Sequence, residues 1–288
     1  AGLGAQSTIM RQAVLNPKTK NPEKVLPMAS NQQSLALTAD GTIWSLVRFL
    51  DGSYSSNDPF RVNDASRHLL LYRSTDGGAS WNQVSKVRTT GSHYGSIAAD
   101  PDGHTLHVTW YAWNGKSSSG TGYSSIFYST YDTLTGKWAG SADEEIAKAT
   151  STSVQFSLPD VAVTATGVVG VVFTTRYGTP AGWVGSGRSW QGGLLWKKGG
   201  KWSAPHQVNQ DGCGVRMEIH ALGDDFHMAY RVTTGGYGIS YRRFDTVTEK
   251  FGPEGEKPVK PDPSNPSRNV RNLYSNSEHS LAVQPGGD

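Results

Sequence analysis

The chain has 288 residues, a length that suits one large β domain or two small ones. The net charge is only +3 and no run of Lys and Arg stands out, which argues against nucleic acid as a partner. The apolar stretches, such as 168–173, are strand-sized, so we expect no membrane insertion. Cys213 is the only cysteine, which excludes a disulfide within the chain and neither requires nor excludes export.

The first segment, residues 1–30, begins with Ala1 and shows no signal peptide. We expect a processed or trimmed chain, from which an export signal could already have been removed. Stretches 6–15 and 24–28 of this segment are candidates for outer strands that close a ring of sheets.

From residue 31 onward one phrase recurs, made of small and β-branched residues followed by a turn. Its copies begin at Ser34, Ser96, Asp160, Glu218 and Ser280. A second apolar strand follows each turn, and later parts of the units also match, as 128–138 matches 241–251. Four strands in roughly 60 residues, repeated along the chain, are typical of a β-propeller blade.

The repeat predicts an all-β fold, a β-propeller of four-stranded antiparallel blades. We expect complete blades at about 31–88, 92–146, 155–209 and 215–253, and a partial fifth blade at 277–288, all within one domain of residues 31–288. Either the N-terminal segment closes the fifth blade, or further chain or a second chain completes the propeller.

The turn Ser74–Trp81 has the pattern Ser-x-Asp-x-Gly-x-Ser-Trp. It resembles the Asp-box of sialidases and other BNR-repeat proteins. The Asp76 carboxylate can accept hydrogen bonds from its own turn, and Trp81 can fill the apolar gap beneath the hairpin. We therefore interpret this motif, like Asp132 and Asp245 in the equivalent turns, as structural.

The long loops, 48–67, 112–123 and 175–191, all join the second and third strands of a blade. In an up-and-down blade these loops share one face with the connections between blades, and the short turns lie on the other face. Long loops on a rigid scaffold commonly carry binding residues. We expect the functional site on this loop face, at the mouth of the central funnel.

Two sets of residues are predicted to line that mouth. The starts of the innermost strands, aligned as 31–33, 92–94, 155–157, 216–218 and 277–279, supply polar and ionisable groups. We predict as catalytic residues His93, Tyr94, Arg216, Glu218 and His279. Aromatic and amide or guanidinium groups suit sugar rings and their hydroxyls. We predict as substrate-binding residues Asn31, Trp113, Arg176, Tyr177, Arg231 and Glu278.

We expect neither a metal nor a cofactor. His104 lies in a short turn, and His107 and His227 occupy equivalent positions of the repeat, which favours a structural role. No nucleotide-binding glycine motif appears in a strand–turn–helix setting.

The segment 95–114 with its continuation 126–129 resembles BNR-repeat polysaccharide lyases of the ulvan lyase type and related propeller rhamnosidases. The Arg-Ile-Pro motif of sialidases is absent, and no arginine triad can be assigned. The resemblance to the lyases implies His93 or His279 as base, Tyr94 as acid and Arg216 as the group that neutralises a uronate carboxylate.

The sequence thus favours a secreted or extracellular propeller that acts on an acidic or deoxy-sugar poly- or oligosaccharide, with a lyase slightly favoured. A hydrolase would use two carboxylates, for which Glu218 and Glu278 are the candidates. A non-catalytic glycan-binding or structural propeller, such as a lectin, adhesin or virion component, is the alternative, so enzymatic activity itself stays open.

Overall fold

The computed structural model describes residues 34–50, 67–89, 92–114, 123–149, 154–176, 180–184, 190–209, 215–232 and 238–253. These residues contain strands and turns, with no helix among them. The N-terminal segment and the predicted fifth blade lie outside the described residues.

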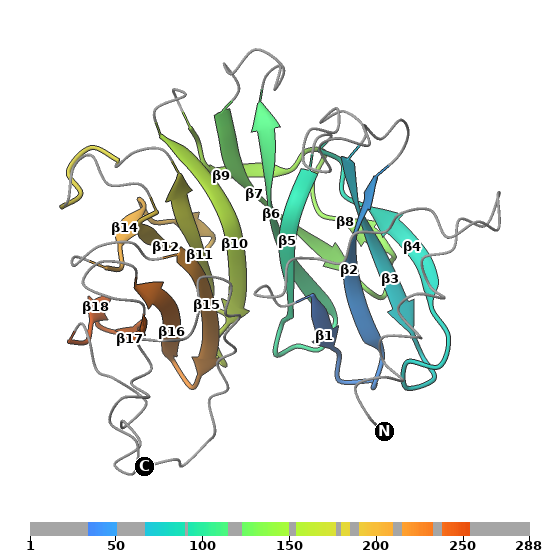
Figure 1. Ribbon diagram of the computed structural model, residues 1–288. Helices are drawn as coiled ribbons and strands as arrows, with labels where there is room; N and C mark the ends of the chain where they lie inside the picture. Colours follow the sequence, from blue (N-terminus) through green and yellow to red (C-terminus); the bar gives the residue numbers. More distant parts are fainter. Residues whose placement is uncertain are drawn as a thin grey trace, which may run out of the picture.

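The strands form four antiparallel sheets, which we call blades 1 to 4 (Figure 1). Blade 1 consists of β1 (Leu35–Leu37), β2 (Ile43–Leu50), β3 (Arg67–Ser74) and β4 (Asn82–Lys86). Blade 2 consists of β5 (Ser92–Ala99), β6 (Thr105–Asn114), β7 (Tyr123–Asp132) and β8 (Lys137–Trp138), with β9 (Glu144–Ala147) also paired to β7.

Blade 3 consists of β10 (Gln155–Val163), β11 (Val169–Arg176), β12 (Gly192–Lys198) and β13 (Lys201–Trp202), with β14 (His206–Gln207) also paired to β12. Blade 4 consists of β15 (Val215–Leu222), β16 (Asp225–Val232), β17 (Gly238–Asp245) and β18 (Lys250–Phe251). The first strands β1, β5, β10 and β15 pack side by side in chain order. This is the arrangement of propeller blades, and it confirms the predicted fold class.

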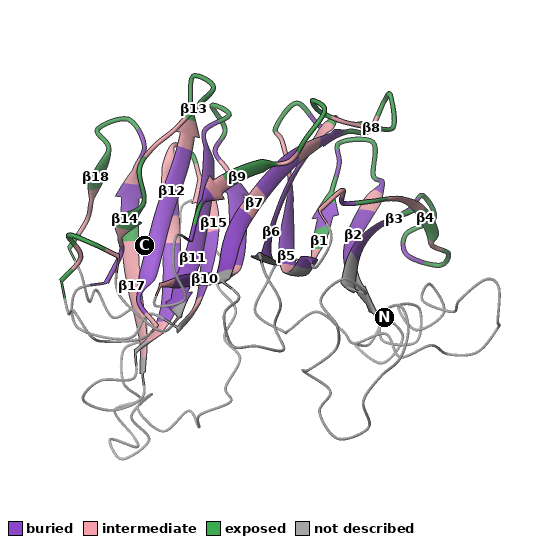
Figure 2. Ribbon diagram, turned by 90° about the horizontal axis from the view of Figure 1, so that it is seen from above, coloured by how far each residue is buried: buried purple, intermediate pink, exposed green. Residues whose placement is uncertain are grey.

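The core lies between neighbouring blades, because alternate residues of each strand point to opposite faces of its sheet. Trp44 and Leu46 of blade 1 pack with Val108 and Trp110 of blade 2. Corresponding clusters join blade 2 to blade 3 and blade 3 to blade 4. Figure 2 shows the buried residues running along the inner strands, with the exposed ones at the turns. Each blade is therefore stabilised mainly by burial against the next one.

The turn between β3 and β4 has the hydrogen bonds expected from its sequence. The Asp76 carboxylate accepts the backbone N–H of Ser80 at 2.8 Å and the hydroxyls of Ser74 and Ser80 at 2.7 and 2.5 Å. These bonds lower the pKa of Asp76 to about 2. The indole N–H of Trp81 donates to the carbonyl of Gly78 at 3.1 Å. The motif organises a hairpin turn, as its residue types suggest.

Candidate functional site

The loop face is set by the antiparallel order of the strands. The turns that join β1 to β2, β5 to β6 and β15 to β16 lie at the lower edge in Figure 1. The starts of the inner strands and the ends of β2, β6, β11 and β16 therefore belong to the opposite edge, which is the loop face. Much of the long loops, residues 51–66, 115–122, 177–179, 185–189 and 233–237, lies outside the described residues.

Three inner strands have a β-bulge close to this face. The pairing of β5 with β6 shifts between Ser92 and Gly95, that of β10 with β11 between Ser157 and Asp160, and that of β15 with β16 between Val215 and Glu218. Each shift leaves two consecutive residues outside the pairing. These are His93–Tyr94, Leu158–Pro159 and Arg216–Met217.

The bulges correct the sequence alignment of the third and fourth blades. We aligned 155–157 and 216–218 with 92–94, but the pairing puts Leu158–Pro159 and Arg216–Met217 in the place of His93–Tyr94. The alignment failed because the bulge stands directly before Asp160 and Glu218 in β10 and β15, whereas in β5 Gly95 separates it from Ser96. Leu158 and Arg216 both have positive φ, 52° and 56°, which is unusual outside glycine.

Tyr94 is half-buried beside the core between blades 2 and 3. Its ring lies 6.1 Å from the ring of Tyr111 at an interplanar angle of 40°. This contact holds the ring of Tyr94 at the loop-face end of blade 2. His93 precedes it in β5, but the side chain of His93 is outside the described part of the structure.

Blade 4 brings three of the predicted residues together. Arg216 is half-buried in the bulge of β15, and Glu218, which pairs with Ala229, is only 6% exposed. Arg231 of β16 pairs with Val215 and is half-buried. Two guanidinium groups and one carboxylate thus come from a single two-strand ladder. The strand β10 lies between this group and Tyr94, since β10 packs against both β5 and β15.

The remaining predicted residues are only partly located. The backbones of Trp113 and Arg176 stand near the loop-face ends of β6 and β11, where Trp113 pairs with Ser124 and Arg176 with Gln155. Their side chains are outside the described residues, as are Asn31, Tyr177, Glu278 and His279 entirely. Roles at these six positions stay predictions.

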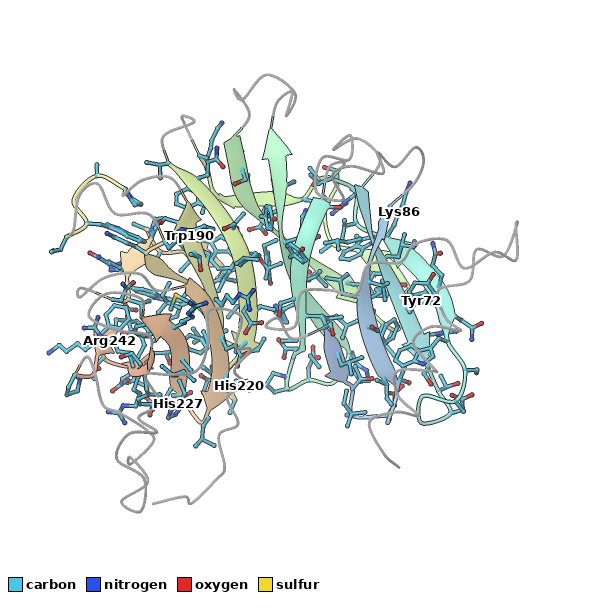
Figure 3. The ribbon with its side chains drawn as sticks, in the orientation of Figure 1. Tyr72, Lys86, Trp190, His220, His227 and Arg242 are labelled. Atoms are coloured by element: carbon cyan, nitrogen blue, oxygen red, sulfur yellow. The ribbon has the colours of Figure 1, made fainter. Side chains whose placement is uncertain are left out.

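A set of histidines, of which His107 is buried and His220 and His227 are half-buried, lies away from this mouth. The ring of His107 contacts the Tyr128 hydroxyl at 2.6 Å and the Asp100 carboxylate at 2.8 Å. His227 contacts the Tyr241 hydroxyl at 2.5 Å and pairs with His220 across the ladder, near the lower edge of blade 4 (Figure 3). Burial lowers the pKa of His220 and of His227.

No cluster of three or more His, Cys, Asp or Glu side chains suited to a metal ion occurs within the described ranges. Those ranges also contain no helix long and apolar enough to cross a membrane.

Sequence reasoning missed the role of Asp160, which is 1% exposed between two blades. Its carboxylate accepts the Ser96 hydroxyl at 2.5 Å and the backbone N–H of Ile219 at 3.0 Å. Ser96 in turn accepts the backbone N–H of Val161 at 3.3 Å. The repeat contained a signal for this contact, because Ser96 and Asp160 are each the first residue of a copy of the repeated phrase and therefore take equivalent places in adjacent blades.

Comparison with known proteins bears on the fold. No protein-family model matches the chain, and no curated protein sequence matches it either. A crystal structure of a protein of unknown function from Dyadobacter fermentans is similar with a TM-score of 0.53 and 18% identity, over 74% of this chain and 60% of that one. An ulvan lyase of polysaccharide lyase family PL25, bound to -[GlcA(1-4)Rha3S]-, is similar with a TM-score of 0.52 and 15% identity.

The ulvan lyase match covers 76% of this chain and 53% of the lyase. A second structure of a PL25 ulvan lyase gives a TM-score of 0.53 at 14% identity over the same shares. The chain therefore spans between about half and three fifths of the length of these proteins. At such identities the likeness supports the fold alone.

Proposed function

We propose that this chain is part of an extracellular β-propeller that cleaves an acidic polysaccharide by β-elimination at a uronate residue. The observation that carries the proposal is the repeated bulge at the loop-face ends of the inner strands. Bulges next to active sites commonly redirect a side chain. Here they hold His93, Tyr94 and Arg216, the three residue types that this elimination needs.

The chemistry assigns one task to each group. A base takes the proton from C5 of the uronate, which is acidic enough only when positive charge stabilises the developing enolate. His93 or His279 would be this base, and Arg216 would bind the carboxylate. The electron pair forms the C4–C5 double bond while the C4–O bond breaks, and Tyr94 gives its proton to the leaving oxygen.

Substrate contacts follow from the same location. Arg231 pairs with Val215, immediately before Arg216, and so stands beside the proposed carboxylate site. The likeness to ulvan lyase supports a scaffold of this kind and leaves the sugar open. We propose a uronate-containing polymer because a guanidinium pairs well with a carboxylate.

The first test uses the purified chain with a panel of uronate polysaccharides and measures both ultraviolet absorbance of unsaturated uronate and new reducing ends. Reducing ends with the absorbance support a lyase. Reducing ends without it contradict the lyase and favour a hydrolase. Binding on a glycan array without either product favours the non-catalytic alternative.

The second test assigns the residues. Tyr94→Phe removes only the hydroxyl and keeps the ring against Tyr111, so we expect a fall in kcat of roughly a hundredfold or more at unchanged thermal stability. Arg216→Ala should lower activity similarly, and so should either His93→Ala or His279→Ala, whichever of the two histidines is the base. Lys137→Ala is the matched control, because Lys137 is exposed in β8 at the opposite edge. Full activity in Tyr94→Phe, or in both His93→Ala and His279→Ala, would contradict the assignment.

A further inference from the structure

One side of blade 4 corresponds to the side by which blades 1, 2 and 3 each pack against the next blade. On β15 and β16 the residues Met217, Ile219, Phe226 and Met228 pack toward blade 3. The alternating residues Glu218, His220, His227 and Ala229 therefore face the other way. We call this side the outer flank of blade 4.

The equivalent flanks of blades 2 and 3 are joined to the next blade by the same hydrogen bond. In blade 2 the acceptor is Ser96, and the donor is the N–H of Val161 at 3.3 Å. In blade 3 the acceptor is Asp160, and the donor is the N–H of Ile219 at 3.0 Å. In both cases the acceptor is the first residue of one repeated phrase and the donor is the second residue of the next.

The series continues in the sequence. Glu218 is the first residue of the phrase in blade 4, and Leu281 is the second residue of the last copy, which begins at Ser280. Glu218 is 6% exposed, and a carboxylate on so buried a residue is stable only where hydrogen-bond donors reach it. The 28 residues from 252 to 279 can span far more than the width of a blade.

We infer that the outer flank of blade 4 is an interface that receives residues 280–283 as the inner strand of a further blade, with Glu218 accepting a hydrogen bond from the backbone N–H of Leu281. This role is independent of the proposed reaction. It makes Glu218 the third member of a series of contacts between blades, after Ser96 and Asp160.

A second feature of the flank fits this occupant. In blade 2 the pair of His107 and Tyr128 is covered by blade 3, where Trp202 packs edge-on against Tyr128 with ring centroids 4.9 Å apart. Blade 4 carries the same pair as His227 and Tyr241. A flank built like that of blade 2 is suited to another blade of this repeat.

Hydrogen–deuterium exchange of the 288-residue chain, followed on peptides that cover 277–288, tests the inference. We expect slow exchange at 280–283. Glu218→Ala should speed it by roughly tenfold or more, since a hydrogen bond to a charged acceptor contributes about that much to an equilibrium. Glu218→Gln is the matched variant, because its amide oxygen still accepts the N–H, and we expect exchange within about threefold of the wild type.

Leu281→Pro removes the donor itself and leaves the described blades untouched, so it serves even where Glu218→Ala fails to fold. We expect fast exchange across 280–283 in this variant. Unprotected amides at 280–283 in the wild-type chain would overturn the inference, and so would protection that survives both Glu218→Ala and Leu281→Pro. Protection that disappears on dilution would assign the flank to a second copy of the chain instead.

Discussion

At the scale of single residues, Asp160 combines two functions in one side chain. It bonds to Ser96 in blade 2 and to Ile219 in blade 4, so it links three consecutive inner strands. A buried carboxylate is costly unless it is hydrogen-bonded, and here both oxygens have donors. These bonds fix the three inner strands β5, β10 and β15 relative to one another, next to their β-bulges.

This arrangement predicts the effect of changing Asp160. Asp160→Ala leaves the N–H of Ile219 without its acceptor, and we expect a loss of about 1–3 kcal/mol in the free energy of unfolding. Asp160→Asn keeps one acceptor oxygen and should lose less. Urea unfolding of both variants measures the difference. Equal stability of Asp160→Ala and the wild type would contradict the proposed link.

At the scale of structural elements, the connection from blade 1 to blade 2 is tied down by Arg88. Its guanidinium bonds to the Asp143 carboxylate at 3.0 Å, to the Ser129 hydroxyl at 3.1 Å, and to two backbone carbonyls near β8. Thr89 adds its N–H and hydroxyl to the same carboxylate at 3.0 and 2.7 Å. The outer strands of blade 2 are thus held by the segment that enters its inner strand.

We expect Asp143→Ala to destabilise the chain by about 1–3 kcal/mol. The Asp143 side chain is only 3% exposed, and its removal leaves the donors of Arg88 and Thr89 without their acceptor. Arg88→Lys should keep the charge but lose the planar set of donors, and therefore most of the stability of this contact. Thermal unfolding checks both variants. If Arg88→Lys matches the wild type, the charge alone is sufficient and the geometric argument fails.

At the scale of the whole molecule, stability should depend on pH through histidines that folding partly removes from water. Burial lowers the pKa of His206, His220 and His227 below the ordinary value of 6.5, and Arg243 adds to the effect at His227 while Asp225 opposes it. Below pH 6.5 the unfolded chain binds protons that the folded chain does not. The free energy of unfolding should therefore fall as pH drops from 6.5 through the folded pKa values.

Urea unfolding between about pH 8 and about pH 5 measures this dependence. We expect His220→Gln and His227→Gln each to flatten the curve. A second decline is expected below pH 3.8, where the Asp carboxylates that accept turn hydrogen bonds, such as Asp76 and Asp245, become protonated. Stability that stays constant across the upper range would contradict the histidine argument.

The sequence by itself determined the repeat and therefore the class of fold. A blade is a local unit of four strands, and its phrases and turns are visible in neighbouring residues, as Ser74–Trp81 shows. Position on a face also follows from strand order, so the sequence indicated correctly that Asp76 belongs to a structural turn. The choice of Tyr94 and Arg216 as site residues came from the same local reasoning and awaits the activity tests.

Only the tertiary structure decided which residues become equivalent near the funnel and which hold the blades together. A β-bulge adds a residue without a strong sequence signal, so the equivalence of Leu158 in blade 3 with His93 in blade 2 was not visible in the alignment. The bond from Asp160 to Ile219 joins residues 59 positions apart. Such contacts depend on how the sheets pack, because the backbone N–H that the side chain reaches belongs to a neighbouring blade. The residues adjacent to Asp160 in the sequence do not indicate which N–H that is.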